Sequence, residues 1–393
     1  MLDIVFRIIR VIPVLALIAV LGFFAFAAPY ADSQRNRLAA VELPPVDSIS
    51  QALHSRLIVV DLHADALLWP RSLTDRSARG HVDLPRLIQG NVAVQLFGAV
   101  TQVPAGQNYE SNPADKDQLW MLAVASRWPV RTWSDVMQRA MYQASRFEDA
   151  ARSSRGRLVL VRTREDLDLR VRLQTRGDTG TVSGLLALEG LQALEGNLAR
   201  LDTLFLAGYR VAGLTHFTDN AVGGSSAGEQ KGGLTPFGRS VVGRMESLGM
   251  IIDLAHASPA LINDVLDLAQ RPVIVSHTGV QGTCPGPRNL SDDAIRRIAK
   301  NGGVIGIGFW DAAVCDITPA GIAKAMMYVA DLVGSGHIAL GSDFDGATTT
   351  AFDASQLVQI THALRLAGFS DGQIEGMMGG NALRVLRAGL PSR

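Results

Sequence analysis

The sequence has little cysteine, little lysine and no excess of charge of either sign. Its 393 residues include two cysteines, which excludes a disulfide-rich scaffold and a zinc module built on cysteine ligands. Any metal site must therefore use histidine and carboxylate side chains. The 37 basic and 37 acidic residues cancel, and this balance argues against a protein that binds nucleic acid. With 47% hydrophobic and 19% charged residues, the chain is not disordered.

One long apolar run lies near the N-terminus. Arg7 and Arg10 precede a stretch from Val11 to about Ala31 that carries no charge. About 20 apolar residues span a bilayer core, and the arginines favour a cytoplasmic N-terminus. We interpret residues 1–31 as a retained membrane anchor and residues 32–55 as a polar tether. A cleaved signal peptide is the alternative, because Ala25-Phe26-Ala27 looks like a cleavage site.

Both interpretations place the rest of the chain outside the cytoplasm, in a periplasmic or extracellular location. Cys284 and Cys315 each follow a predicted strand, and an oxidising compartment would allow them to pair. We hypothesise a disulfide between them. Two unpaired buried thiols are the alternative.

From residue 56 the chain alternates short apolar runs with helical patterns, which predicts a parallel sheet covered on both faces. Eight such runs occur, which favours a closed (β/α)8 TIM-like barrel over residues 56–393. A doubly wound open sheet is the competitor, but no glycine fingerprint follows the first run. The runs are Leu57–Val60, Val92–Val100, Gly184–Leu188, Tyr209–Leu214, Met250–Leu254, Pro272–Val275, Gly303–Gly308 and Ile338–Leu340.

An insertion, residues 102–182, separates the second run from the third. It predicts helices over Asn112–Trp128 and Trp133–Ser153, then a short strand, Leu158–Val161, and another helix. We expect its tryptophans to pack on the barrel. The insertion is also a candidate for a lid or for the interface of a homodimer.

Polar residues stand at the C-terminal ends of six of the eight runs, where barrel enzymes hold their catalytic groups. A set of this kind is hard to explain structurally, although a lone histidine would be uninformative. Imidazole and carboxylate ligands without thiolates suit zinc. The residues at these ends are His63 and Asp65, Glu189, His216, His256, His277, and Asp343 with Asp345.

Five of these residues are candidate metal ligands: His63, Asp65, Glu189, His256 and His277. Five ligands fit two ions if one carboxylate bridges them. None of the four lysines, Lys116, Lys231, Lys300 and Lys324, follows a predicted strand. A lysine-derived bridge is therefore unsupported, and Glu189 is the natural bridging ligand.

These residues carry a resemblance to the membrane dipeptidase (renal dipeptidase) family, the M19 metallopeptidases. The similar pieces occur in the family's order over roughly residues 56–390, and the ordered set is specific although each piece alone is weak. One departure is Ala64, where the family often has Asn, and it affects neither neighbouring ligand. The pieces are Asp61–Asp65, Leu188–Gly190, Leu214–Phe217 with Asn220, Asp253–His256, Val275–His277, Pro287–Leu290 and Gly341–Gly346.

The resemblance implies a site with two zinc ions. His63 and Asp65 would hold one ion, His256 and His277 the other, with Glu189 between them and a bridging hydroxide as nucleophile. His216 would stabilise the oxyanion and contact substrate, and Asp343 would move the proton from water to the leaving amine. Asp345 has the stronger claim to a structural role.

Arg288 would bind the C-terminal carboxylate of the substrate, a task that suits a guanidinium. The expected function is an exported zinc dipeptidase that tolerates a D-residue at the C-terminal position. One alternative is hydrolysis of β-lactam or cyclic amide substrates at the same site. The other is a membrane-anchored binding protein without activity, which would predict a broken ligand set.

Overall fold

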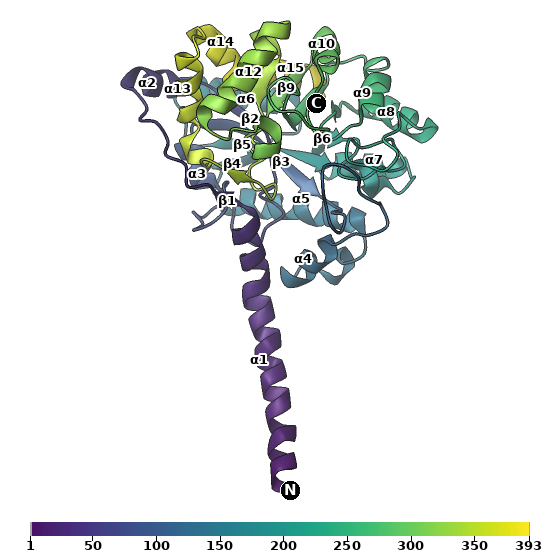
Figure 1. Cartoon of the computed structure of the whole chain (residues 1–393). Helices are drawn as coiled ribbons and strands as arrows, with labels where there is room; N and C mark the ends of the chain where they lie inside the picture. The colour runs from purple at the N-terminus through teal and green to yellow at the C-terminus, as the bar shows by residue number, and fades with distance from the viewer. Residues whose placement is uncertain (1, 393) are drawn as a thin grey trace.

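A closed barrel of parallel strands forms the body of the protein, and a long helix projects from it (Figure 1). The computed structural model describes residues 2–392, with side chains from residue 13 onward. Within these residues eight strands form the barrel, which closes because β3 pairs with both β2 and β5. The predicted (β/α)8 fold is confirmed. The barrel strands are β2 (Val59–Ala64), β3 (Val92–Val100), β5 (Val182–Glu189), β6 (Tyr209–Gly213), β7 (Ile251–Asp253), β8 (Ile274–Thr278), β9 (Val304–Ile307) and β10 (Ile338–Leu340).

Every residue of these strands is buried, which explains their continuous apolar runs. Helices surround the sheet, and several begin where a side-chain cap and a proline predict it. Thr235 caps α8 ahead of Pro236, and Thr318 caps α12 ahead of Pro319. The helices after the insertion are α7 (Ala199–Leu206), α8 (Pro236–Leu248), α9 (Pro259–Leu266), α10 (Asp292–Lys300), α11 (Asp311–Val314), α12 (Pro319–Val333), α13 (Val358–Leu366), α14 (Asp371–Glu375) and α15 (Asn381–Gly389).

The insertion is less helical than the sequence predicts. The helix expected over Asn112–Trp128 is only α4 (Leu119–Ala125), because Asn112 binds the Ala227 carbonyl through both its backbone and its side chain. This pairing holds the first half of the segment extended. The second predicted helix is α5 (Val136–Ser153), and β4 (Leu158–Leu160) adds to the start of β5 before α6 (Arg164–Thr175).

The expected packing of the insertion's tryptophans is correct for one of the three. Trp128 is buried in a small cluster with Leu68 and Trp69. Trp120 is instead 48% exposed and Trp133 is 37% exposed. Trp120 lines a cavity together with Ala27 and Ala31 of the projecting helix.

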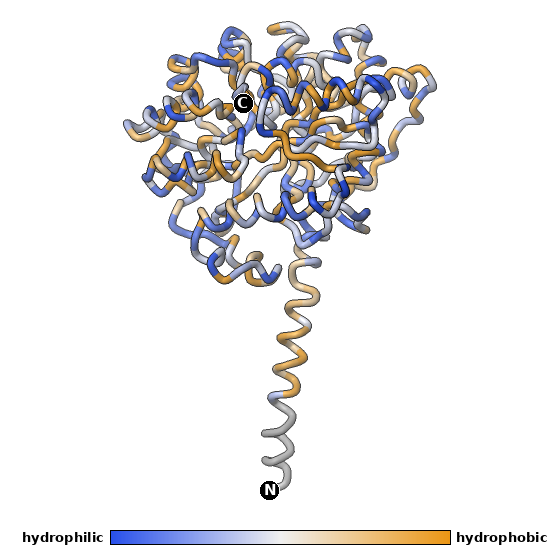
Figure 2. The backbone as a smooth tube through the Cα atoms, turned by 180° about the vertical axis from the view of Figure 1, so that it is seen from behind, coloured by the Kyte–Doolittle hydropathy of each residue, from blue (hydrophilic) through white to orange (hydrophobic). Residues whose placement is uncertain are grey.

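That projecting helix is α1 (Leu2–Arg35); most of its described apolar part extends away from the body (Figure 2), while its C-terminal turns contact α4. Within Pro13–Arg35 an 18-residue stretch has a mean hydropathy of 2.2, enough by length and composition to cross a membrane, and this segment is the one such candidate in the described chain. The end of α1 is fixed to the body, because the buried carboxylate of Asp32 pairs with Arg71 at 2.8 Å and Arg79 at 2.9 Å.

Residues 32–55 are not a free tether, and this corrects the division made from the sequence. After α1, β1 (Arg37–Leu38) pairs with β11 (Thr349–Thr350), and α2 (Ser48–His54) packs on α13. The imidazole of His54 is buried between the Thr361 hydroxyl at 2.8 Å and the Gly90 carbonyl at 3.1 Å. Short α3 (Leu84–Gln89) completes this side of the barrel.

The two cysteines form a disulfide in the structure, Cys284–Cys315, which joins the loop after β8 to the end of α11. Both residues lie near the mouth of the barrel, because each belongs to a segment that follows a strand. Arg288 lies in the same loop as Cys284, four residues further along the chain. The crosslink therefore ties this loop to the segment that follows β9.

Candidate metal centre

The histidines and carboxylates from separate strand ends converge on the carboxylate of Glu189. Its Oε1 atom lies 3.0 Å from His256 Nε2, 3.3 Å from His277 Nε2 and 3.7 Å from His63 Nε2. His63 Nε2 in turn lies 3.3 Å from Asp65 Oδ1. Glu189 thus stands between one pair, His63 and Asp65, and a second pair, His256 and His277.

The barrel produces this convergence from residues that are far apart in the sequence. His63 lies at the end of β2, Glu189 ends β5, and His277 lies in β8. Parallel strands of a barrel deliver their C-terminal ends to one mouth, so these side chains meet there. Gly98 of β3 leaves the necessary room, because a Cβ atom at this position would come within 2.2 Å of Asp65 Oδ1.

The electrostatics of this cluster favour a cation at its centre. Burial would lower the pKa of His63, but the carboxylates of Asp65 and Glu189 outweigh it and raise that pKa to about 10. Burial lowers the pKa of His256 and His277 well below the usual range, so both rings are neutral. Burial and the neighbouring Asp65 raise the pKa of Glu189. Neutral imidazoles around crowded carboxylates are the donor set that a divalent metal requires.

The hydrogen bonding of the described residues also fits a metal. His63 Nε2 and Asp65 Oδ1 are buried without a hydrogen-bond partner in the described chain. His256 Nε2 and His277 Nε2 face each other at 3.0 Å, and a shared cation would satisfy both lone pairs. The other ring nitrogen of His277 bonds to the Ser276 hydroxyl at 2.9 Å, which orients the ring.

Asp343 lies beside this cluster on a strained loop. Its Oδ1 atom is 3.9 Å from His63 Nε2, and burial raises the pKa of its carboxyl to about 8. Asp343, Asp345 and Ala347 all have positive φ angles, so the loop is held in a costly conformation. Asp345 supports it by accepting hydrogen bonds from the backbone of His81 and Val82, a structural role.

His216 lies on the opposite side of Glu189, with its Nε2 atom 3.4 Å from Oε2. Its Nδ1 atom bonds to the Gln102 carbonyl at 3.2 Å, and a carbonyl only accepts. The proton of the neutral ring is therefore on Nδ1. Burial lowers the pKa of His216 to about 3, so Nε2 presents a lone pair to the cluster.

Arg288 is a buried cation without a carboxylate partner among the described residues. One Nη atom donates to the His277 carbonyl at 2.8 Å, while the Nε atom has no partner in the described chain. Burying an unpaired guanidinium is costly, and Arg288 lines the same cavity as Glu189. These features suit an arginine that binds an anionic group of a ligand.

Sequence reasoning missed other residues of the site. Tyr109 from the insertion and Trp310 after β9 line the cavity, and the indole N–H of Trp310 donates to the Tyr109 hydroxyl at 3.0 Å. Trp310 could have been found as a strand-end residue, but it carries no titratable group. Tyr109 had no signal, because only the fold brings the insertion over the barrel mouth.

A supporting layer beneath the metal centre was also missed. The carboxylate of Asp61 accepts hydrogen bonds from the backbone and hydroxyl of Ser342 and from the Gln95 amide. Asp253 accepts from the backbone of Ala255 and Ser276. These buried carboxylates link neighbouring strand ends and fix the segments that carry His63, His256 and His277.

Comparison with known proteins identifies the family of the chain. The family model "Membrane dipeptidase (Peptidase family M19)" matches residues 48–389. The dipeptidase verJ of Clonostachys rogersoniana is 30% identical over 358 residues, 86% of this chain and 87% of that protein. The dipeptidase aclJ of Aspergillus oryzae is 35% identical over 219 residues, which cover 53% of this chain and 51% of that protein.

A solved structure shares the fold. It is a metallopeptidase from Rhodobacter sphaeroides liganded with a phosphinate mimic of the dipeptide L-Ala-D-Ala, with a TM-score of 0.70 and 22% identity over 85% of this chain and 99% of that one. The family model spans the whole barrel and every residue of the metal centre. The chain therefore belongs to the membrane dipeptidase family, peptidase family M19, and is a metal-dependent dipeptidase.

Proposed function

We propose that the protein is a membrane-anchored, exported dipeptidase that uses two zinc ions. The observation that carries the proposal is the position of Glu189 between two ligand pairs, His63 with Asp65 and His256 with His277. Two ions held there would supply Lewis acidity and an activated water as nucleophile. A single ion would leave one of the two pairs without a role.

The remaining side chains position the substrate and move protons. Arg288, buried and without an acidic partner in the described chain, binds the C-terminal carboxylate of the dipeptide. This places the peptide bond over Glu189. Asp343, next to His63, accepts a proton from the water and donates it to the leaving amine.

His216 faces the carbonyl of the scissile bond. Burial lowers the pKa of His216 and keeps the ring neutral, and the Gln102 carbonyl engages its Nδ1 proton. Nε2 therefore donates to the oxyanion only if the negative charge that develops there draws a second proton onto the ring. A His216→Asn protein should therefore keep both metals and lose turnover. Loss of one metal would assign His216 as a ligand instead.

The C-terminal residue of the substrate is proposed to be tolerated in either configuration. The Rhodobacter sphaeroides structure holds a mimic of L-Ala-D-Ala, and in this chain the whole cavity that Arg288 lines has a volume of about 560 Å³. A carboxylate held by one guanidinium fixes the backbone end of that residue. It does not by itself fix the configuration at the α-carbon.

The full-length protein tests these proposals. Elemental analysis should find two zinc ions per chain, and removal by a chelator should abolish hydrolysis until zinc is restored. Ala-D-Ala and Ala-Ala should both be cleaved. A β-lactam assayed beside them tests ring opening at the same site, and rapid β-lactam turnover with inert dipeptides would contradict the proposed substrate class.

A further inference from the structure

The insertion and the anchor meet at the entrance of the catalytic cavity. This cavity contains Glu189 and Arg288 at its inner end, and α1 and α4 form its outer walls, through Ala27 and Ala31 on one side and Trp120 and Val124 on the other. Figure 1 shows α4 at the edge of the body nearest the apolar helix. The path to the metal centre therefore begins beside the helix that is proposed to cross the membrane.

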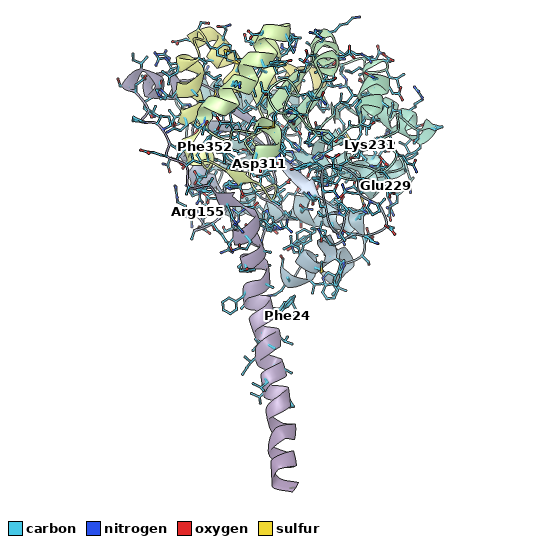
Figure 3. The ribbon with its side chains drawn as sticks, viewed as in Figure 1. Phe24, Arg155, Glu229, Lys231, Asp311 and Phe352 are labelled. Carbon is cyan, nitrogen blue, oxygen red and sulfur yellow. A yellow bond between two sulfur atoms is a disulfide. The ribbon has the colours of Figure 1, made fainter. Side chains whose placement is uncertain are left out.

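The contacts place this edge at the level of the bilayer. Arg127 donates a hydrogen bond to the Phe24 carbonyl at 3.0 Å, and Phe24 lies on the stretch of α1 just below the body (Figure 3). At about 1.5 Å per residue, Phe24 is about 10 Å short of the end of the apolar run at Ala31. If α1 spans the membrane, residues 119–134 reach the headgroup and upper acyl region.

The composition of residues 119–134 suits that depth. The segment holds three tryptophans, two arginines and no Asp or Glu. Four of its large apolar side chains are open to solvent: Trp120 and Met121 are about half exposed, Val130 is 70% exposed and Trp133 is 37% exposed. Arg127 and Arg131 are exposed on either side of Val130. Aromatic residues with flanking arginines are typical of protein surfaces that lie in the membrane interface.

We propose that residues 119–134 are a membrane-interfacial element that inserts into the outer lipid leaflet beside α1, so that the catalytic cavity opens at the bilayer surface. The occupant of this apolar surface is the headgroup region of the membrane that α1 crosses. The inference rests on the proposed anchor. It adds to the proposed function a fixed orientation and a route by which substrate enters.

Spin labelling of the full-length protein in phospholipid vesicles tests the proposal. Both native cysteines are in the disulfide, so a single added cysteine can be labelled. Val130→Cys reports on the proposed element, and Leu366→Cys is the matched control, because both positions are 70% exposed and Leu366 ends the distant helix α13. Collision with oxygen, which concentrates in lipid, is compared with collision with a water-soluble nickel chelate.

The label at residue 130 should collide with oxygen several-fold more than with the nickel chelate, while the label at residue 366 shows the reverse. Equal exposure of both labels to the chelate would overturn the proposal. A label at residue 130 shielded from both reagents would also overturn it, because a protein partner would then cover the surface.

The mass of the same sample separates failure of the anchor from failure of the interface. A chain that has lost residues 1–31 overturns both, although its dipeptidase activity still tests the proposed chemistry. A retained anchor with a water-exposed residue 130 overturns the interface alone.

Discussion

The inner end and the outer walls of the catalytic cavity are built on opposite principles. The inner end is polar and rigid. His63, Glu189 and His277 are each at most 6% exposed and come from strand ends. The outer walls are apolar and partly exposed, and come from α1 and the insertion. The barrel strands thus fix the positions of the candidate metal ligands, whereas segments outside the barrel form the entrance through which a substrate reaches them.

Replacing Glu189 should have the largest effect on the inner end. A Glu189→Ala protein should lose metal, and kcat should fall by more than about 10,000-fold because the activated water is lost. Elemental analysis measures the metal content, and dipeptide turnover measures kcat. Glu229→Ala removes an exposed carboxylate at the surface and serves as the control (Figure 3). Two metals retained per chain would rule out the bridging role.

Asp343 tests whether the proton path is separate from metal binding. An Asp343→Asn protein should keep its metals and lose kcat by about 100- to 1,000-fold, since general acid–base catalysis contributes on that scale. The matched control is Asp311→Asn, an exposed acidic residue near the barrel mouth. Unchanged turnover in Asp343→Asn would remove this residue from the mechanism.

Replacing Arg288 should weaken substrate binding. An Arg288→Ala protein should raise KM for free dipeptides by about 10- to 100-fold, because a hydrogen bond to a charged group is lost. Dipeptide amides lack the carboxylate, so their KM should differ much less between the wild-type and Arg288→Ala proteins. A similar rise in KM for amides and free dipeptides would contradict the carboxylate assignment.

Asp32 tests whether the end of α1 is part of the folded body. It pairs with Arg71, which also binds Asp345 in the loop that carries Asp343. An Asp32→Ala protein leaves a buried guanidinium short of one partner and should lose about 3 kcal/mol of stability. Urea unfolding measures the change, with exposed Asp75→Ala as control. An unchanged free energy of unfolding would make this end of α1 a loose tether after all.

The smallest expected effect concerns buried His54, which should make the free energy of unfolding depend on pH. Burial lowers its pKa from 6.5 to about 4, so the unfolded chain takes up a proton at a higher pH than the folded one. The contribution of neutral His54 to the free energy of unfolding is fully present above about pH 6.5. It is lost as the pH falls toward 4, and the total loss is up to about 3 kcal/mol. Urea unfolding at pH 7.5 and pH 5 should show a shallower dependence in His54→Gln than in wild type, and equal slopes would exclude this origin.

Much of the metal centre was readable in the sequence because parallel strands of a barrel present their last residues to one mouth. The rule located His63, Glu189, His256 and His277 without any knowledge of distances. It could not find Tyr109, since nothing local distinguishes a tyrosine in an insertion from a packing residue. It also missed Gly98, whose missing Cβ matters only because Asp65 lies against it.

The sequence by itself determined the barrel, the set of candidate ligands and the apolar helix, because each rests on periodicity or on position relative to a strand. Only the tertiary structure decided that residues 32–55 pack on the barrel and that α4 is short, since both depend on partners distant in the chain, such as Arg71 for Asp32 and Ala227 for Asn112. The same long-range contacts bring the anchor and the insertion together at the cavity entrance. No local pattern encodes that meeting, because Phe24 and Arg127, which join its two sides, are 103 residues apart.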